Sequence, residues 1–336
     1  MATKKAFPLP FLYKLLISLI VLGAMFWTAL IFGAVDTTIR DVWIAITSHT
    51  KEERALMIWE LRIPREIAAA FVGAALSISG AVMQGMTRNP LADPGLLGLT
   101  AGANAALAIT LAFFPAANYL LITMACLVGA AIGSMVVFGI GAVKKGGFSP
   151  LRIVLAGSAV SMFLYAVAEG ISLYFKISKD VSMWTAGGMS GTTWKQLQMI
   201  TPFLVVGAVI AFFFARQLTV LSLNEEVAIG LGQKTIQVKT MLFIAVLLLA
   251  GASVALAGNM TFVGLMIPHI VRAIVGTDYR FILPMSATVG GAFMLLADTL
   301  GRTINAPYET PVAAIVAVMG LPFFLFIVHK KGGTFS

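Results

Sequence analysis

The residue types that most often carry chemistry are few in this sequence and lie far apart. The three histidines, His49, His269 and His329, have no metal-ligand spacing, and the single cysteine, Cys126, lies in an apolar stretch. Neither an Asp-rich phosphate-binding motif nor a nucleophile elbow occurs. We therefore predict that this chain has no catalytic residue, no metal ligand and no cofactor of its own.

One glycine-rich stretch superficially resembles a phosphate-binding loop. Residues 230–235 read Gly-Leu-Gly-Gln-Lys-Thr, whereas a Walker A motif requires Gly-Lys-Ser/Thr after a four-residue gap. Gln233 separates Gly232 from Lys234, and no predicted strand precedes the stretch. The chain is therefore not expected to bind ATP, and an ATP-driven reaction would need MgATP on another subunit.

Two acids, Glu169 and Asp298, lie inside long apolar stretches. Asp298 precedes Arg302 by four residues, which is the favourable order for a helical ion pair. The sequence suggests no partner for Glu169. Because proton- and sodium-coupled carriers usually place ionisable groups within their spans, an ion-coupled secondary transporter stays an open alternative.

The composition places these groups in a membrane protein. The chain has 336 residues, of which 59% are hydrophobic and 11% charged, and a membrane-spanning helix needs about 20 apolar residues. We predict an all-α polytopic fold with about ten transmembrane helices, of which the eighth is short. The predicted spans are residues 15–35, 67–87, 96–115, 118–143, 153–175, 199–215, 240–258, 260–271, 281–301 and 311–328.

The first apolar stretch could also be a signal peptide, because Lys4 and Lys5 precede it. We interpret it as a span, since it is longer than the apolar region of a signal peptide and no clear cleavage site follows. The whole chain, residues 1–336, is then one transmembrane domain. An even number of spans places both termini on one side of the membrane.

The distribution of basic residues predicts which side that is. With both termini cytoplasmic, 14 of the 23 basic residues lie inside and 9 outside. The net charge of +9 reflects this bias and gives no reason to expect nucleic-acid binding. The inside group is Lys4, Lys5, Lys14, Arg88, Lys144, Lys145, Arg152, Arg216, Lys234, Lys239, Arg272, Arg280, Lys330 and Lys331, and the outside group is Arg40, Lys51, Arg54, Arg62, Arg65, Lys176, Lys179, Lys195 and Arg302.

The third and eighth spans are both interrupted by proline and glycine. Pro90, Pro94 and Gly98 break the entry to the third, while Gly264 and Pro268 interrupt the eighth. Dividing the spans five and five makes these two correspond, as in transporters built from two inverted-repeat-like halves. No repeat is visible at the level of single residues.

Small residues and three long connections complete the organisation. Gly73 and Gly80 predict close helix packing. Residues 36–61 and 176–198 are predicted outside, the latter with interfacial Trp184 and Trp194. Residues 216–239 form the longest inside loop and the expected contact for a cytoplasmic partner.

Several motifs resemble the permease family that imports iron-siderophores, haem and cobalamin. They occur in the family's order, from the second predicted span to the last. The stretches are residues 61–65 (Leu-Arg-Ile-Pro-Arg), 80–85 (Gly-Ala-Val-Met-Gln-Gly), 89–98, 258–270, 297–302 (Ala-Asp-Thr-Leu-Gly-Arg) and 309–312 (Glu-Thr-Pro-Val).

The resemblance implies an ABC importer of type II in a bacterial plasma membrane. Its permease subunit would pair with a second permease, as a homodimer or heterodimer, and with two cytoplasmic ATPase subunits. An extracytoplasmic binding protein would deliver an iron-siderophore complex, with cobalamin or haem as alternatives. The chain itself would be no enzyme.

The resemblance also implies roles for particular residues. Acids of the binding protein would dock on Arg62, Arg65 and Arg302. Alternatively, Arg62 and Arg65 would only anchor the second helix at the interface, balanced by Glu66, and Arg302 would pair with Asp298 alone. Leu223, Glu225, Glu226, Gly230 and Gly232 match the family's ATPase-coupling segment. The pathway would be lined by Ser158, Ser161, Met162, Val312, Val316 and Met319.

The coupling segment is expected to form two short helices, with Gly230 and Gly232 allowing the turn between them. Glu225 and Glu226 could stabilise a helix start through its dipole or pair with basic ATPase residues. The predicted pathway residues include no chelating group. Selectivity for the transported chelate is therefore expected to lie in the binding protein.

Overall fold

Every secondary-structure element that the structure describes is helical. The computed structural model describes residues 10–33, 37–47, 53–142 and 150–332. The α-helices are α1 (Phe11–Ile31), α2 (Ile39–Thr47), α3 (Glu53–Met57), α4 (Ile63–Thr87), α5 (Leu99–Phe113), α6 (Tyr119–Ala142), α7 (Pro150–Tyr174), α8 (Ser178–Thr185), α9 (Trp194–Phe213), α10 (Ala215–Leu223), α11 (Glu225–Gly230), α12 (Thr235–Ala257), α13 (Val263–Val275), α14 (Tyr279–Thr303) and α15 (Val312–Gly332). A π-helical turn, η1 (Ile58–Arg62), joins α3 to α4, and a 3-10 turn, η2 (Pro94–Leu97), precedes α5.

Each of the ten predicted spans corresponds to one long or short apolar helix. Seven helical segments of the described chain are long and apolar enough to cross a membrane. The other three, α5, α13 and the described part of α15, are apolar but shorter. The chain is thus a multi-pass helical membrane protein.

The third and eighth predicted spans are irregular where the sequence indicated. Before α5, Asp93 caps η2 by accepting a hydrogen bond from the Gly95 amide at 2.8 Å. Before α13, Gly258 and Phe262 have φ angles of +73° and +67°, which end α12 and start a new helix in another direction. Both helices are short because the backbone leaves helical geometry at their starts.

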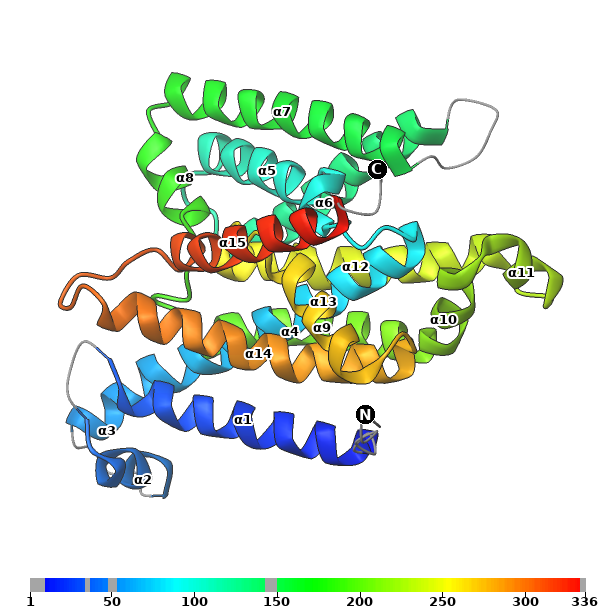
Figure 1. Ribbon diagram of the computed structural model, residues 1–336. Coiled ribbons are helices and arrows are strands. Elements are labelled where there is room, and N and C mark those ends of the chain that lie inside the picture. Colours follow the sequence, from blue (N-terminus) through cyan, green and yellow to red (C-terminus); the bar gives the residue numbers. More distant parts are fainter. Residues whose placement is uncertain (1–9, 34–36, 48–52, 143–149, 333–336) are drawn as a thin grey trace.

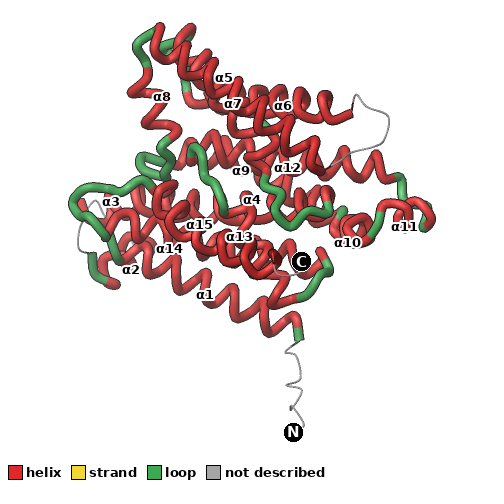
Figure 2. The backbone as a smooth tube through the Cα atoms, turned by 45° about the horizontal axis from the view of Figure 1, so that its top comes forward, coloured by secondary structure: helices red, strands yellow, loops and turns green. Residues whose placement is uncertain are grey.

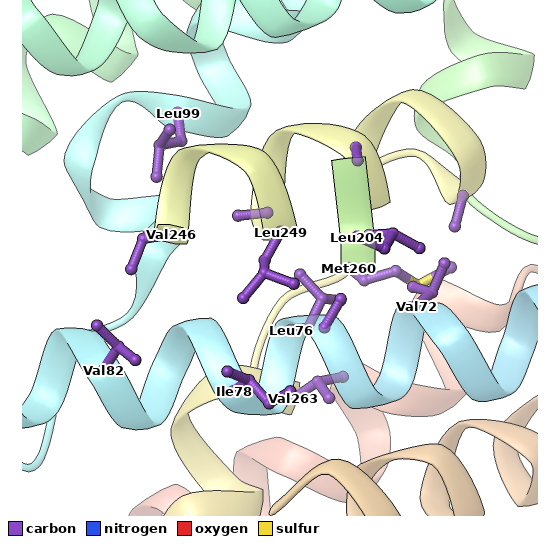
Figure 3. Close-up of a cluster of buried hydrophobic side chains, with 14 of the residues drawn as sticks. Val72, Leu76, Ile78, Val82, Leu99, Leu204, Val246, Leu249, Met260 and Val263 are labelled. Carbon is purple, nitrogen blue, oxygen red and sulfur yellow. The ribbon is translucent and has the colours of Figure 1, made fainter. Parts of the chain in front are cut away.

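Helix α4 runs through the middle of the bundle. Its apolar side chains, including Val72, Leu76 and Val82, meet those of α12 and the segment that leads into α13, as Figure 3 shows for Val246, Leu249, Met260 and Val263. On other faces of α4, close approach depends on glycine. A Cβ atom on Gly73 would overlap the Gly290 carbonyl oxygen of α14, and one on Gly80 would overlap that of Gly264 in α13. The predicted close packing is confirmed at both positions.

Short helices mark the two ends of the bundle. In Figures 1 and 2, α2 and α3 lie at one end and α10 and α11 at the other, where α11 projects from the bundle. We call the first the arginine end, because Arg62, Arg65 and Arg302 lie there, and the second the α10–α11 end. Lys14 of α1 donates to the Ile274 carbonyl at 2.6 Å near the second end. Lys4, Lys5, Lys51, Lys144 and Lys145, which entered the orientation prediction, lie outside the described residues.

The crossing of α4 and α14 gives a first prediction. Replacing Gly73 by Ala places a methyl group against backbone that cannot rotate away, so we expect a loss of about 1–3 kcal/mol in stability. The measurement is the thermal unfolding temperature of the detergent-purified protein. Gly23→Ala on α1 is the control, since no atom lies within 4 Å of its Cβ position. Equal melting temperatures for the two variants would contradict this account.

Candidate functional site

The three predicted docking arginines come together at the arginine end. Arg62 lies at the start of α4, Arg65 one turn further along, and Arg302 in the last turn of α14. Arg62 and Arg302 are only 7% and 4% exposed. A Cβ atom on Gly33 would lie 3.1 Å from Arg62 and 3.5 Å from Arg302, so both guanidinium groups reach the chain just after α1.

Two acids pair with Arg65 and Arg302 in a buried network. Arg65 donates two hydrogen bonds to Asp298, from Nε to Oδ2 at 3.0 Å and from Nη2 to Oδ1 at 2.9 Å. Arg302 lies 3.1 Å from the same carboxylate and 2.5 Å from Glu66. The predicted Asp298–Arg302 pair is confirmed. The sequence did not predict that Asp298 also pairs with Arg65 or that Glu66 pairs with Arg302. Both pairs join α4 to α14, which lie far apart along the chain.

Arg62 instead donates hydrogen bonds at the C-terminal end of α1. Its Nη1 donates to the Leu30 carbonyl at 2.8 Å and to the Thr37 hydroxyl at 2.7 Å. Arg302 adds a hydrogen bond of 3.2 Å to the Ala29 carbonyl. The last carbonyls of a helix lack partners within the helix and carry partial negative charge, so a cation there is stabilising. The alternative in which Glu66 balances Arg62 and Arg65 while Arg302 pairs with Asp298 alone is therefore wrong, because Glu66 pairs with Arg302 and Asp298 also pairs with Arg65.

Arg65 also reaches the edge of the network. Its Nη1 donates to Glu309 at 2.7 Å, and the Glu309 side chain is 41% exposed. The Ser190 hydroxyl, from the loop between α8 and α9, donates to the other oxygen of Glu309. Partial burial would raise the pKa of Glu309, but these hydrogen bonds hold it below its ordinary value of 4.5. The contact is thus present at neutral pH and is lost only as the pH falls through that lowered pKa.

The α10–α11 end presents apolar side chains to the surroundings. The predicted pair of short helices is present as α10 and α11. Leu223 is 71% exposed, and Val227, Ile229 and Leu231 are also exposed. A cluster of exposed apolar side chains outside the apolar spans is typical of a protein-binding surface.

The two acids of this segment, Glu225 and Glu226, differ in their contacts. Asn224 caps α11 by accepting a hydrogen bond from the Glu226 amide at 2.9 Å, and both Glu225 and Glu226 lie in the first turn. Glu225 pairs with Lys239 of α12 at 2.5 Å. Glu226 is exposed, so it is the acid that a partner could contact.

The predicted role of Gly230 and Gly232 in the turn between the two helices is wrong. That turn lies at Asn224, whose φ of −159° is extended backbone. Gly230 is the last residue of α11 and has no positive φ, whereas Gly232, with φ +78°, turns the chain toward α12. The sequence pattern located a turn but not which helices it joins.

The predicted pathway residues are divided between two helices. On α7, Ser158 and Met162 are exposed, whereas on α15, Val312 and Val316 are buried inside the chain. Ser161 and Met319 are partly exposed. Val312 and Val316 therefore do not face outward in this structure. Glu169 lies exposed on the same helix as Met162.

The described residues contain no group of three His, Cys, Asp or Glu side chains that could hold a metal ion. Fold and site together define a helical membrane protein with a buried ion network at one end and an apolar projection at the other.

Comparison with known proteins identifies the family. The FecCD transport family matches residues 19–330. The iron(3+)-hydroxamate import system permease FhuB of Bacillus subtilis (strain 168) is 44% identical over 315 residues, 93% of this chain and 81% of that protein. The Fe(3+)-citrate import system permease YfmD of the same organism is 40% identical, covering 89% of each chain. The chain belongs to the FecCD transport family.

The fold agrees with a solved membrane transporter. A structure described as a metal-chelate type ABC transporter in an inward-facing conformation has a TM-score of 0.81 with this chain. It covers 96% of this chain and 100% of its own length at 24% identity. The shared arrangement of helices thus extends over nearly the whole chain.

The ion network gives a second prediction. Asp298→Asn removes the charge that neutralises two buried arginines, so we expect a loss of about 3–5 kcal/mol, the usual cost of breaking a buried pair on one side. Thermal unfolding of the purified protein measures it. Asp41→Asn is the control at the same end, because Asp41 faces the exposed Arg54 at 4.0 Å and such surface pairs contribute little. A melting temperature of Asp298→Asn no lower than that of Asp41→Asn would show that the buried network does not stabilise the fold.

Proposed function

We propose that this chain is the permease subunit of an ATP-driven importer, which translocates an iron-siderophore complex delivered by an extracytoplasmic binding protein. The observation that carries the proposal is the family match over residues 19–330. The chain contributes spans and docking surfaces but no nucleotide-binding loop of its own. ATP hydrolysis then belongs to two cytoplasmic ATPase subunits.

The substrate class follows from the relatives. The two described above have names that specify Fe(3+) chelates. A hemin permease of Yersinia pestis and a cobalamin permease of Halobacterium salinarum match at 34% and 37% identity. A ferric siderophore, held as a hydroxamate or similar chelate, is therefore favoured over haem or cobalamin.

In this proposal the chain has ten spans in two inverted-repeat-like halves, with both termini cytoplasmic. The short helices α5 and α13 take the corresponding positions of the two halves. The arginine end then faces the binding protein, and the α10–α11 end faces the ATPase. A second permease subunit would cover the exposed side of α7 and complete the pathway near Ser158 and Met162.

The binding protein is proposed to dock through Arg65 in particular. Arg62 and Arg302 already have buried partners, so their role is to add positive potential around Arg65, which Asp298 holds in place. The half-exposed Glu309 occupies the position that an incoming carboxylate would take. Docking would exchange one carboxylate for another on Arg65, which avoids leaving a buried charge unpaired.

This exchange gives a third prediction. Glu309→Gln weakens the internal competitor without touching the Arg65–Asp298 pair, so binding-protein affinity should rise severalfold, most clearly at low salt. Surface plasmon resonance on the permease in nanodiscs measures it. The control is Glu60→Gln, which removes an exposed acid at the same end.

A decrease in affinity for Glu309→Gln would overturn the exchange, and so would equal gains in both variants. Charge reversal at Arg62 or Arg65 is less informative. It also disrupts the buried contacts of each arginine, so a folding defect would mimic a docking defect.

The ATPase is proposed to bind the exposed apolar side chains of α10 and α11. A fourth prediction follows, because Leu223→Asp places a charge in this surface and should weaken ATPase binding at least about tenfold, as expected for a central interface residue. Copurification of ATPase with tagged permease is the measurement. Ile39→Asp changes an equally exposed apolar residue at the opposite end and should leave ATPase binding intact. Normal ATPase binding by Leu223→Asp would remove α10–α11 as the contact.

The whole proposal is tested by reconstitution. Proteoliposomes that contain the permease, its copurifying ATPase and the binding protein should take up ferric siderophore only with ATP. Vanadate should abolish uptake and an uncoupler should not. The opposite pattern would identify the alternative, an ion-coupled secondary transporter.

A further inference from the structure

A chain of polar contacts leads from α10 to α13, a helix that contains Pro268. It contains Gln84 of α4, Arg272 of α13 and Tyr279 of α14. None of these side chains belongs to the arginine end or to the exposed apolar surface. Gln84 and Tyr279 are buried, and burying polar groups is costly unless they are hydrogen-bonded.

The chain of contacts begins where proline interrupts α13. Pro268 has no amide hydrogen, so the Gly264 carbonyl, four residues earlier, lacks its helical donor. The side-chain amide of Gln84 fills this position, with Nε2 at 3.1 Å from the Gly264 oxygen and 3.3 Å from that of Leu265. Gly80 lets α4 approach closely enough for this contact. Gln84 thus stabilises the kink of α13 from a neighbouring helix.

The other end of Gln84 is held by an arginine and a tyrosine. Arg272 donates from Nη2 to Gln84 Oε1 at 2.5 Å and to the Tyr279 hydroxyl at 3.3 Å. The Tyr279 ring packs on Gly85, whose Cβ position would lie 2.7 Å from the ring. The contacts therefore join α4, α13 and α14 at one point.

Tyr279 is in turn tied to α10. Its backbone amide donates to the Thr219 hydroxyl at 2.9 Å, and Thr219 lies 3.1 Å from Asp278, the cap of α14. Leu218, the residue before Thr219, packs on the same Gly85. A Cβ atom added to Gly85 would lie 2.7 Å from the Leu218 side chain. A displacement of α10 would consequently move the start of α14 and the Tyr279 hydroxyl with it.

Residues on both sides of Pro268 contact α15. The His269 ring lies edge-on to the Phe323 ring, with 5.9 Å between the ring centroids. The ring centroids of Phe262 and Phe324 are 6.4 Å apart. Phe262 also fills the space beside Gly320. A change in the kink of α13 is thereby transmitted to α15, where part of the pathway is predicted.

We propose that Gln84, Arg272 and Tyr279 are positioning residues that transmit movement of α10 to the Pro268 kink of α13, and through it to α15. The inference rests on the proposed function, because it assigns α10 to the ATPase side. The three side chains come from three different helices, and single substitutions can remove their hydrogen bonds separately. The linkage then couples ATP hydrolysis to the pathway rather than holding the ATPase itself.

Tyr279→Phe tests the linkage because it removes only the hydroxyl and keeps the ring on Gly85. We expect ferric siderophore uptake per ATP hydrolysed to fall roughly 2- to 10-fold, the equilibrium factor of about one hydrogen bond. ATPase copurification and the melting temperature should stay unchanged. Tyr119→Phe is the matched control, since the Tyr119 hydroxyl lies 3.4 Å from the Ala255 carbonyl, outside this chain of contacts.

Gln84→Glu is a second, independent variant. A carboxylate keeps an acceptor for Arg272 but cannot donate to the Gly264 carbonyl, so uptake per ATP should fall as for Tyr279→Phe. An unchanged ratio in both variants would overturn the linkage, and so would an equal fall in Tyr119→Phe. If the wild-type complex shows no ATP-dependent uptake, the proposed function fails instead, and the two failures are distinguished.

Discussion

The paired charges between α4 and α14 are the constraint on which the arginine end depends. An ionised side chain taken out of water costs several kcal/mol unless opposite charge and hydrogen bonds compensate it. Arg65, Glu66, Asp298 and Arg302 supply two charges of each sign within one buried cluster. This balance requires α4 and α14 to lie at one register, and the absence of a side chain at Gly73 lets them reach it.

The same need for satisfied polar groups shapes the middle of the bundle. Within a membrane, backbone groups without partners cannot turn to water, so a kinked helix needs donors from its neighbours. Gln84 supplies such a donor to the carbonyl that Pro268 leaves open. A residue that first satisfies the backbone thereby connects three helices. The irregular helix is thus tied into the bundle at the carbonyl that its proline leaves open.

In the proposed function, the two ends of the bundle and its interior have different roles. At the arginine end, Asp298 holds Arg65, whose other partner, Glu309, is only half buried. In the proposed function, an acid of the binding protein competes with Glu309 for Arg65. At the α10–α11 end, exposed apolar side chains offer binding area outside the spans. The interior contributes packing and the polar contacts that connect these ends. A chain with so little reactive chemistry can still act through where its partners bind and how its helices move.

The sequence by itself determined the class of fold, because apolar runs of membrane length can be counted without knowing how they pack. It also located the irregular starts of α5 and α13 and the Asp298–Arg302 pair, since each depends on neighbours within a few residues. The two short helices α10 and α11 were expected from the family resemblance, but the turn between them was wrongly assigned to Gly230 and Gly232. The sequence could not find the Arg302–Glu66 pair or the contacts of Gln84. Those partners are more than 170 residues apart along the chain. Only the tertiary structure decided which arginines are buried and which one meets a half-exposed acid, because burial and pairing depend on helices that the chain brings together from its opposite halves.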